Sequence, residues 1–308
     1  MRTNSGASVS LRTFFLMAFL SLLTFTLAET APGDYLDTLR LNPEASRETV
    51  EAARIRLGLD RPWWERYGRW CASVLRGDFG ESMTYGMPVS RLLADRLPNT
   101  LLLNFAATLT AWLLAAGLGW LAARHSGGIT DLLLLVSNTI FVALPELVIA
   151  LLGLWMFGNF AALPWVVLTL GALPGPVVHF REALQGAVSH PSVESARMLG
   201  IRGTRLWWSY VLPLAAAPLL PVIGLSFGGL LSASLLVEAA LSWPGLGTLL
   251  LDAIQSRDTA VVAAVVALSG GLLLLANLGA EMARAALDPR LRRVAIPLGE
   301  RPGKRQVS

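Results

Sequence analysis

Lysine is almost missing from this chain: of 25 basic residues, Lys304 is the only lysine, and Arg305 follows it. The common phosphate-binding loop, G-x-x-x-x-G-K-[ST], needs a lysine followed directly by serine or threonine, because that lysine contacts the terminal phosphates of ATP. The sequence therefore excludes this ATP-binding loop. Any ATP-driven process in which the chain takes part must draw its energy from a partner.

Cysteine and histidine are also scarce. Cys71 is the only cysteine, so no disulfide can form within the chain, and we expect a buried apolar side chain there. The histidines number three and are scattered, at His125, His179 and His190. No group of residues has the spacing of a metal site, and we expect no cofactor bound by this chain itself.

Charge is low throughout the chain, with 15% charged residues against 54% hydrophobic ones in 308 residues. This is too apolar for a soluble protein of this length. The intervals 13–28, 97–123, 206–237 and 259–280 carry no charge, and 132–180 carries only Glu146. A membrane-spanning helix needs roughly 20 apolar residues, so the longest interval holds two, divided near Gly158-Asn159 and Pro164. We predict an all-α polytopic membrane protein with six transmembrane helices.

The first interval has a second interpretation. Arg2 and Arg12, an apolar core and Ala28 before Glu29 also fit a secretory signal peptide. The pattern alone leaves both a retained helix and a cleaved signal open.

Arginine placement predicts the orientation, because cytoplasmic loops of membrane proteins are enriched in basic residues. Six spans put both termini on one side, together with Arg124, Arg181 and Arg197, whereas the short loops opposite hold Arg257. Both termini are therefore predicted in the cytoplasm. The predicted divisions are 1–28 (N-terminus and first helix), 29–98 (extracytoplasmic), 99–285 (five-helix core with a polar loop at 189–213 and an extracytoplasmic loop at 242–258) and 286–308 (cytoplasmic tail). We see no aromatic-interleaved basic patch, and expect no nucleic-acid partner.

The polar run HPSVESARMLGIRGTRLWWSYVLPL, residues 190–214, interrupts the apolar second half of the chain. Pro191 suits the first turn of a helix, Ser192 can cap it, and Glu194 meets the positive end of the helix dipole. Gly200 can end the helix in a left-handed conformation, and a second helix is predicted after Thr204. A helix of about two turns is not stable alone in water, so it needs a surface to dock on.

The spacing of this run resembles the "EAA" loop of ATP-binding-cassette importer permeases, which has E-A-A, then glycine at the seventh position and Leu-Pro at the nineteenth and twentieth. The matching residues are Glu194, Ser195, Ala196, Gly200, Leu212 and Pro213. Ser195 replaces an alanine, and Tyr210 stands where an aliphatic residue is usual. In that family the loop forms a coupling helix that sits in a groove of a cytoplasmic ATPase subunit.

Further fragments resemble one subgroup, the dipeptide, oligopeptide and nickel importers. They are APGD (31–34), LGLDRPWWERY (57–67), GDFGES (77–82), LPNTLLL (97–103), SWPGLG (242–247) and ALDPRLRR (286–293). Tyr35 departs from the proline that often follows Gly33-Asp34 in the subgroup. The likeness covers nearly the whole chain, and the motifs occur in the expected order.

The resemblance implies a type I importer permease fold in a prokaryotic cell membrane, with the first helix retained. It implies that one chain forms half of the pathway, beside a second homologous permease, two cytoplasmic ATPase subunits that bind ATP and magnesium, an extracytoplasmic solute-binding protein and membrane lipid. This chain would not be an enzyme. Peptide is the expected cargo, with a nickel chelate or another small solute as the alternative. The residues expected to couple to the ATPase are Ser192, Glu194, Ser195, Ala196, Leu199 and Gly200.

Three polar residues in the apolar spans are candidates for the translocation pathway: Glu146, Ser226 and Ser232. A carboxyl group within a span is expensive and marks either a pathway or a site paired with another helix. The resemblance places the span of Ser226 and Ser232 along the pathway. The glycines nearby, Gly224, Gly228 and Gly229, also fit simple helix packing.

Two other functions remain open. Residues 224–228 spell G-x-S-x-G, the nucleophile elbow of serine hydrolases if it lies between a strand and a helix; here it lies in an apolar span, and every histidine precedes it. An ion-coupled secondary transporter could use Glu146 as its proton carrier, although it has no need of a cytoplasmic docking loop. Transport by the chain alone, driven by a proton gradient, would favour this second alternative.

Overall fold

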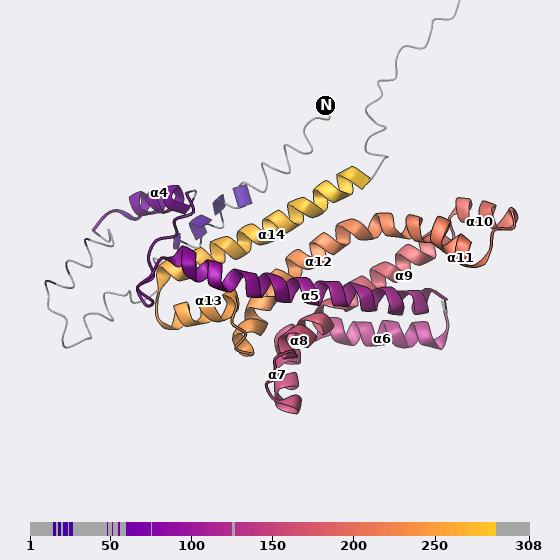
Figure 1. Cartoon of the computed structure of the whole chain (residues 1–308), viewed down its shortest axis with the longest axis horizontal. Coiled ribbons are helices and arrows are strands. Elements are labelled where there is room, and N and C mark those ends of the chain that lie inside the picture. The colour runs from indigo at the N-terminus through magenta and orange to yellow at the C-terminus, as the bar shows by residue number, and fades with distance from the viewer. Residues whose placement is uncertain are drawn as a thin grey trace, which may run out of the picture.

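The computed structural model describes residues 60–74, 76–124 and 127–287, together with isolated positions between 15 and 55 (Figure 1). This part of the chain is helical, and its only strand-like pairing is an isolated bridge between Glu81 and Pro88. The helices are α4 (Trp63–Val74), α5 (Val89–Arg124), α6 (Ile129–Ala143), α7 (Glu146–Phe157), α8 (Leu163–Ala172), α9 (Pro174–Val188), α10 (Pro191–Met198), α11 (Gly203–Leu206), the π-helix η1 (Trp207–Val211), α12 (Leu212–Ala240), α13 (Leu246–Gln255) and α14 (Thr259–Leu287).

The predicted all-α membrane class is confirmed, but the described residues contain fewer candidate spans than the six predicted. Three continuous helices are long and apolar enough to cross a membrane: Val89–Arg124, Gly203–Ala240 and Thr259–Met282. Two bent pairs, α6 with α7 and α8 with α9, raise the number of candidate spans to five among the described residues. The first predicted span, 13–28, is described only at isolated positions, and His125 and the tail beyond residue 287 lie outside the described residues.

The third predicted span is broken directly before Glu146, its only charged residue. α6 and α7 meet at an angle of 96°. Leu144 is extended (φ −93°, ψ 116°) because the following Pro145 crowds a helical conformation, and Glu146 then begins α7. Glu146 is therefore in the first turn of a new helix and not within a straight span.

The predicted break inside 132–180 is confirmed. α7 ends at Gly158, which has a φ of 70°, and Pro164 lies in the first turn of α8. A further bend of 42° separates α8 from α9 at Pro174. The sequence analysis did not predict this second bend.

The helices after the polar loop form one rod. We predicted a separate helix capped by Thr204; instead Arg202 precedes the helix in an extended conformation, and no side chain caps it. From Gly203 the chain runs through η1 into α12 without interruption to Ala240. Leu212 and Pro213 thus lie inside a continuous helix, where Pro213 is accommodated after the wider π-helical turn.

Glycines set the closest helix crossings. An added Cβ at Gly119 of α5 would lie 2.6 Å from the Cβ of Phe180 in α9, and one at Gly224 of α12 would lie 2.9 Å from the Cβ of Ala280 in α14. Gly228 of α12 faces Ala276 of α14. For Gly224 and Gly228 the helix-packing interpretation is therefore confirmed, because small residues allow backbones to approach.

Two aromatic residues of α4 pack on one ring of the N-terminal segment. Tyr67 and Trp70 contact the ring of Phe25, with centroids 5.4 and 6.0 Å apart, and the Tyr67 hydroxyl bonds the Ser21 hydroxyl at 2.8 Å. After α4, α5 begins at Val89, so the last residues of the 29–98 segment are already its first turns.

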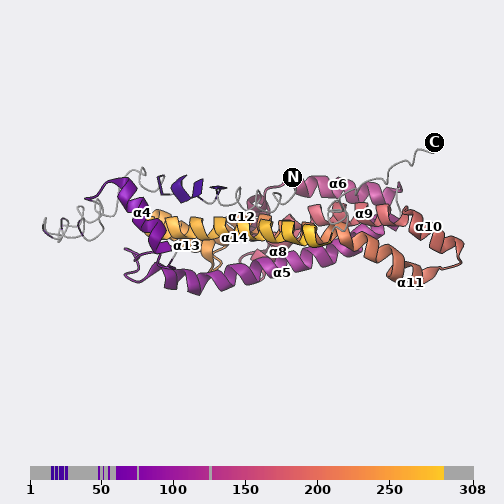
Figure 2. The ribbon, with the colours of Figure 1, turned by 90° about the horizontal axis from the view of Figure 1, so that it is seen from above.

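Both views show an elongated molecule with two distinct ends (Figures 1 and 2). α10 and α11 lie at one end, and α4 and α13 lie at the other. α5, α12 and α14 run along the length between them.

Candidate functional site

The short helix α10 begins with a histidine cap. His190 has an extended backbone, and its Nδ1 accepts a hydrogen bond from the Ser192 N–H at 3.3 Å. The prediction that Ser192 caps the helix is wrong by two positions, because Pro191 already occupies the first helical position. The Ser192 hydroxyl bonds the same His190 nitrogen at 2.7 Å.

Gly200 ends α10 in the left-handed conformation that the sequence predicted. Its φ is 82°. The Ile201 N–H donates to the Ala196 carbonyl at 3.0 Å, and the Gly200 N–H donates to the Arg197 carbonyl at 3.0 Å. This pair of bonds is the Schellman motif, which satisfies carbonyls at the helix end. Both ends of the two-turn helix are thus fixed by local hydrogen bonds.

The inner face of α10 is buried against two long helices. Val193 and Ala196 are almost fully buried. They belong to one apolar cluster with Leu184 and Ala187 of α9, Leu206 of α11, Val211 of η1 and Ala215 of α12. A displacement of α10 therefore acts directly on α9 and on the α11–α12 rod, because close-packed interiors transmit movement rather than absorb it.

The outer face of α10 is exposed and partly apolar. Met198 and Leu199 are 79% and 81% exposed, and Trp208 of η1 is 71% exposed. Of the predicted coupling residues, Ala196 alone points inward; the exposed ones are Ser192, Glu194, Ser195, Leu199 and Gly200. We call Glu194, Met198 and Leu199 the docking face. Met198 was not among the predicted coupling residues, because the spacing of the resemblance does not mark it and its exposure follows from the packing of Val193 and Ala196 on the inner face.

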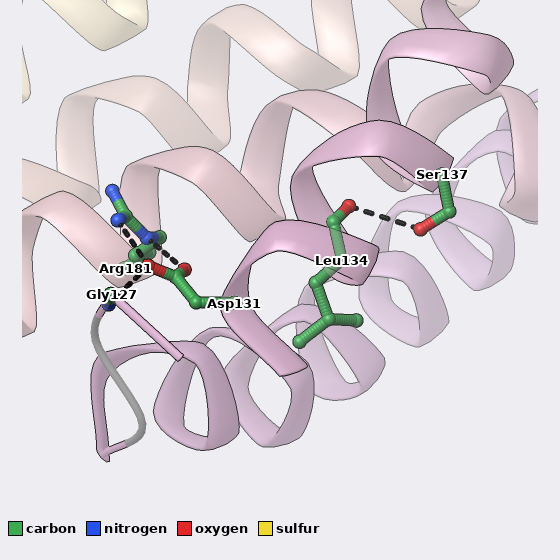
Figure 3. Close-up of polar contacts among 5 residues, drawn as sticks. All are labelled: Gly127, Asp131, Leu134, Ser137 and Arg181. Atoms are coloured by element: carbon green, nitrogen blue, oxygen red, sulfur yellow. Dashed lines mark hydrogen bonds and ion pairs between the residues drawn. The ribbon is translucent and has the colours of Figure 1, made fainter. Parts of the chain in front are cut away.

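An ion pair fastens the start of α6 to α9, as Figure 3 shows. Arg181 donates to both carboxylate oxygens of Asp131, from Nε to Oδ1 at 2.6 Å and from Nη2 to Oδ2 at 2.7 Å. The Gly127 N–H also donates to Oδ2, at 3.0 Å. In contrast, Ser137 farther along α6 bonds only the Leu134 carbonyl of its own helix. Sequence reasoning missed this pair because its members are 50 residues apart.

A pocket of 360 Å³ lies behind α10, between α9 and α12. Its polar lining comes from His179, Glu182 and His190, and Leu214 and Pro218 contribute apolar surface. Within the described residues, no group of three histidine, cysteine or acidic side chains has the geometry of a metal site.

The three pathway candidates have different surroundings. Glu146 packs over Gly171 of α8, where an added Cβ would lie 2.6 Å from its Cγ. Ser226 is half-buried and its hydroxyl donates to the Val222 carbonyl at 2.9 Å, whereas Ser232 is exposed on α12. Because Ser226 lies within helix α12, the strand-to-helix turn of a nucleophile elbow is absent, and the serine-hydrolase alternative fails.

The sequence of this chain matches one protein family. The family described as "Binding-protein-dependent transport system inner membrane component" matches residues 115–293. The chain is 30% identical to the probable peptide ABC transporter permease protein y4tP of Sinorhizobium fredii, over 91% of this chain and 96% of that protein. It is 29% identical to the oligopeptide transport system permease protein AppB of Bacillus subtilis, over 88% and 94%. It is 31% identical to the glutathione transport system permease protein GsiC of Salmonella paratyphi A, over 90% and 94%.

Among solved structures, the chain resembles the MetNI methionine ABC transporter in an inward-facing conformation, with a TM-score of 0.51 and 20% identity. The match covers 64% of this chain and 96% of that one. At this identity the likeness concerns the fold alone.

Proposed function

The chain belongs to the family of binding-protein-dependent transport system inner membrane components, and we propose that it forms half of the pathway through which an ATP-driven importer carries peptides across a prokaryotic cell membrane. It is a multi-pass permease subunit of an ABC importer. The single observation that carries the mechanism is α10: a two-turn helix whose inner face is buried against α9, α11 and η1 and whose outer face is exposed.

Peptide is the cargo that the relatives favour. Relatives with different names, for peptide, oligopeptide and glutathione transport, each match about nine-tenths of the chain. Glutathione is itself a small peptide. We therefore propose peptides ahead of a nickel chelate or another small solute.

The proposed assembly contains a second homologous permease, two cytoplasmic ATPase subunits and an extracytoplasmic solute-binding protein, in membrane lipid. ATP and magnesium would be bound by the ATPase subunits, since the only lysine of this chain is Lys304, before Arg305. The termini and α10 would face the cytoplasm, and residues 29–98 and α13 would face the other side.

Movement passes from the ATPase into the membrane through α10. The approach of the two ATPase subunits on binding ATP would displace the docking face. Val193 and Ala196 are packed against α9 and the α11–α12 rod, and that rod is continuous from Gly203 to Ala240. A shift at one end would therefore pass into this helix and the helices packed on it, because packed elements transmit small shifts.

The test is the double variant Glu194→Arg with Gly200→Arg. It reverses a charge on the docking face and forces a side chain into the left-handed position. We expect transport-coupled ATP hydrolysis to collapse while the chain still inserts into the membrane. The matched control is Asp95→Arg, an exposed charge reversal in the first turns of α5. Unchanged uptake in the double variant would remove the coupling role of α10.

Glu146, with Ser226 and Ser232, is proposed to face the pathway. Glu146 is half-buried at the α6–α7 bend, and a polar side chain that remains partly accessible at membrane depth suits a path for hydrophilic cargo. We expect Glu146→Gln to lower peptide uptake and to alter its pH dependence, measured in vesicles that contain the assembled importer. Glu281→Gln, an exposed carboxylate near the end of α14, serves as the control; equal uptake in the two variants would end the pathway role.

A further inference from the structure

At the end of the molecule opposite α10, a buried carboxylate holds the first turn of α13. Glu238, in the last turn of α12, is fully buried. Its Oε2 accepts hydrogen bonds from the Gly247 N–H at 2.8 Å and from the Thr100 hydroxyl of α5 at 3.1 Å. The Leu246 N–H donates to the same Thr100 hydroxyl oxygen at 2.9 Å. Three helices therefore meet at one polar cluster.

The directions of these bonds are fixed by the donors. An amide N–H can only donate, so the Thr100 oxygen accepts from Leu246 and its single proton goes to Glu238. The first N–H groups of a helix have no partner within the helix, and here two of them are satisfied by Glu238 and Thr100. The carboxyl group also lies at the positive end of the α13 dipole. Both Glu238 and Thr100 are buried, so these bonds are made away from bulk solvent.

Close contacts require glycine at two positions of the cluster. An added Cβ at Gly245 would lie 2.5 Å from Glu238 Oε2 and 2.6 Å from the Thr100 hydroxyl. An added Cβ at Gly247 would overlap the backbone carbonyl of Leu235, which cannot turn aside as a side chain can. The sequence S-W-P-G-L-G thus lets the backbone of α13 lie directly on the end of α12.

The turn between α12 and α13 makes further hydrogen bonds. The Asn99 side-chain amide donates to the Pro244 carbonyl at 2.8 Å, and the Trp243 N–H donates to the Glu238 carbonyl at 2.9 Å. The buried face of α13, with Leu246, Leu249 and Ala253, packs in one cluster with Val261 and Val265 of α14.

A second buried carboxylate holds the other end of α13. Asp258, just after α13, is 1% exposed. Its Oδ2 accepts from the Ser82 hydroxyl at 2.6 Å and from the Thr84 N–H at 3.2 Å, and its Oδ1 accepts from the Val261 N–H at 3.3 Å. The fragment GDFGES is thus tied to the beginning of α14, and α13 is fixed at both ends.

We propose that Glu238 and Thr100 are positioning residues, a clamp that makes α13 a fixed extension of α12 and α5. The segment 242–258 then moves with the end of α12 as one body when the importer changes conformation, and is not a lid hinged at Pro244. The physical reason is that lifting α13 would take the Gly247 and Leu246 amide donors away from the buried Glu238 and Thr100 oxygens and would uncover the apolar face of α13, each at substantial cost. This proposal rests on the proposed importer function.

The experiment measures the distance between spin labels at Asp95→Cys on α5 and Gln255→Cys on α13, both exposed positions, with Cys71→Ser as the background. In the assembled importer in lipid, we expect one narrow distance distribution that stays the same with and without a non-hydrolysable ATP analogue. A distribution that moves between the two nucleotide states would overturn the clamp.

Variants identify the groups responsible. Thr100→Val keeps the shape of the side chain but removes the acceptor for Leu246, and we expect the ratio of docked to undocked α13 to fall on the order of tenfold, seen as a second distance. Glu238→Gln keeps an oxygen that can accept both bonds and should preserve the single distance. The matched control is Thr110→Val, since the Thr110 hydroxyl bonds only the Ala106 carbonyl within α5.

Identical distributions for Thr100→Val and Thr110→Val would also overturn the clamp. This contrast is measured on the full chain alone in lipid as well, where it does not depend on transport. Suppose that peptide does not stimulate ATP hydrolysis by the importer, but the two threonine variants still differ as expected. The proposed function would then be contradicted, and the clamp would stand.

Discussion

At the residue scale, the Asp131–Arg181 pair shows how two charges are kept in a largely apolar chain. Both carboxylate oxygens are engaged, and the side chains of Asp131 and Arg181 are only 5% and 20% exposed. The planar guanidinium makes two parallel bonds that a lysine cannot reproduce. The pair joins α6 to α9, the helix that precedes α10.

Substitutions that weaken this pair should lower the stability of the folded chain. We expect Asp131→Asn to lower the thermal unfolding temperature in detergent, because Arg181 loses its counter-charge while still mostly buried. Arg181→Lys should lower it less, since the charge stays and one bond is lost.

The control for this pair is Asp95→Asn, which changes an exposed carboxylate and should leave the unfolding temperature nearly unchanged. If Asp131→Asn unfolded at the same temperature as this control, the ion pair would contribute nothing to stability.

At the scale of the elements, helix crossings depend on which face of a helix carries glycine. Gly117 and Gly119 lie two positions apart on α5, and an added Cβ at Gly117 meets nothing within 4 Å. An added Cβ at Gly119 meets Phe180 and the Arg181 backbone. The same substitution should therefore have opposite effects at the two sites.

Gly119→Ala is expected to destabilise the chain by about 1–3 kcal/mol, because α9 must move away from α5. Gly117→Ala should be neutral or stabilising by up to about 1 kcal/mol, because alanine restricts the unfolded chain. Unfolding of the two variants in the same lipid or detergent measures the difference. A loss of stability in Gly117→Ala with none in Gly119→Ala would contradict the observed α5–α9 crossing.

At the scale of the whole molecule, one end carries an exposed surface and the other a helix fixed by buried hydrogen bonds. One end presents the docking face on a short helix, and the other holds α13 between two buried carboxylates. The proposed mechanism needs these ends on opposite sides of the membrane, joined by the rod from Gly203 to Ala240.

Cysteine labelling tests this orientation, since Cys71 is the only native cysteine and can be replaced by serine. We expect Gln255→Cys to react with a membrane-impermeant maleimide in intact cells. Leu199→Cys, 81% exposed, should react only in inverted vesicles. Reaction of both positions from the same side would contradict the topology, and with it the path of movement from α10 to α13.

Much of the fold follows from signals that act within one or two helical turns. The uncharged intervals predicted the helical membrane class, Gly158 and Pro164 marked a real break, and the run from Pro191 to Gly200 gave a two-turn helix with a left-handed end. Even the wrong local predictions, at Ser192 and Thr204, missed a boundary and not the existence of a helix. These features depend on backbone conformations that nearby residues allow or forbid.

What only the tertiary structure decided is which distant residues meet. Arg181 and Asp131 are 50 residues apart, and Thr100 and Glu238 are 138 apart. The sequence by itself determined that the apolar intervals are helical, and it marked one of the breaks between them, at Gly158 and Pro164. The tertiary structure decided the partners of the buried charges and the faces left exposed, because those depend on the packing of whole helices and no single turn contains that information.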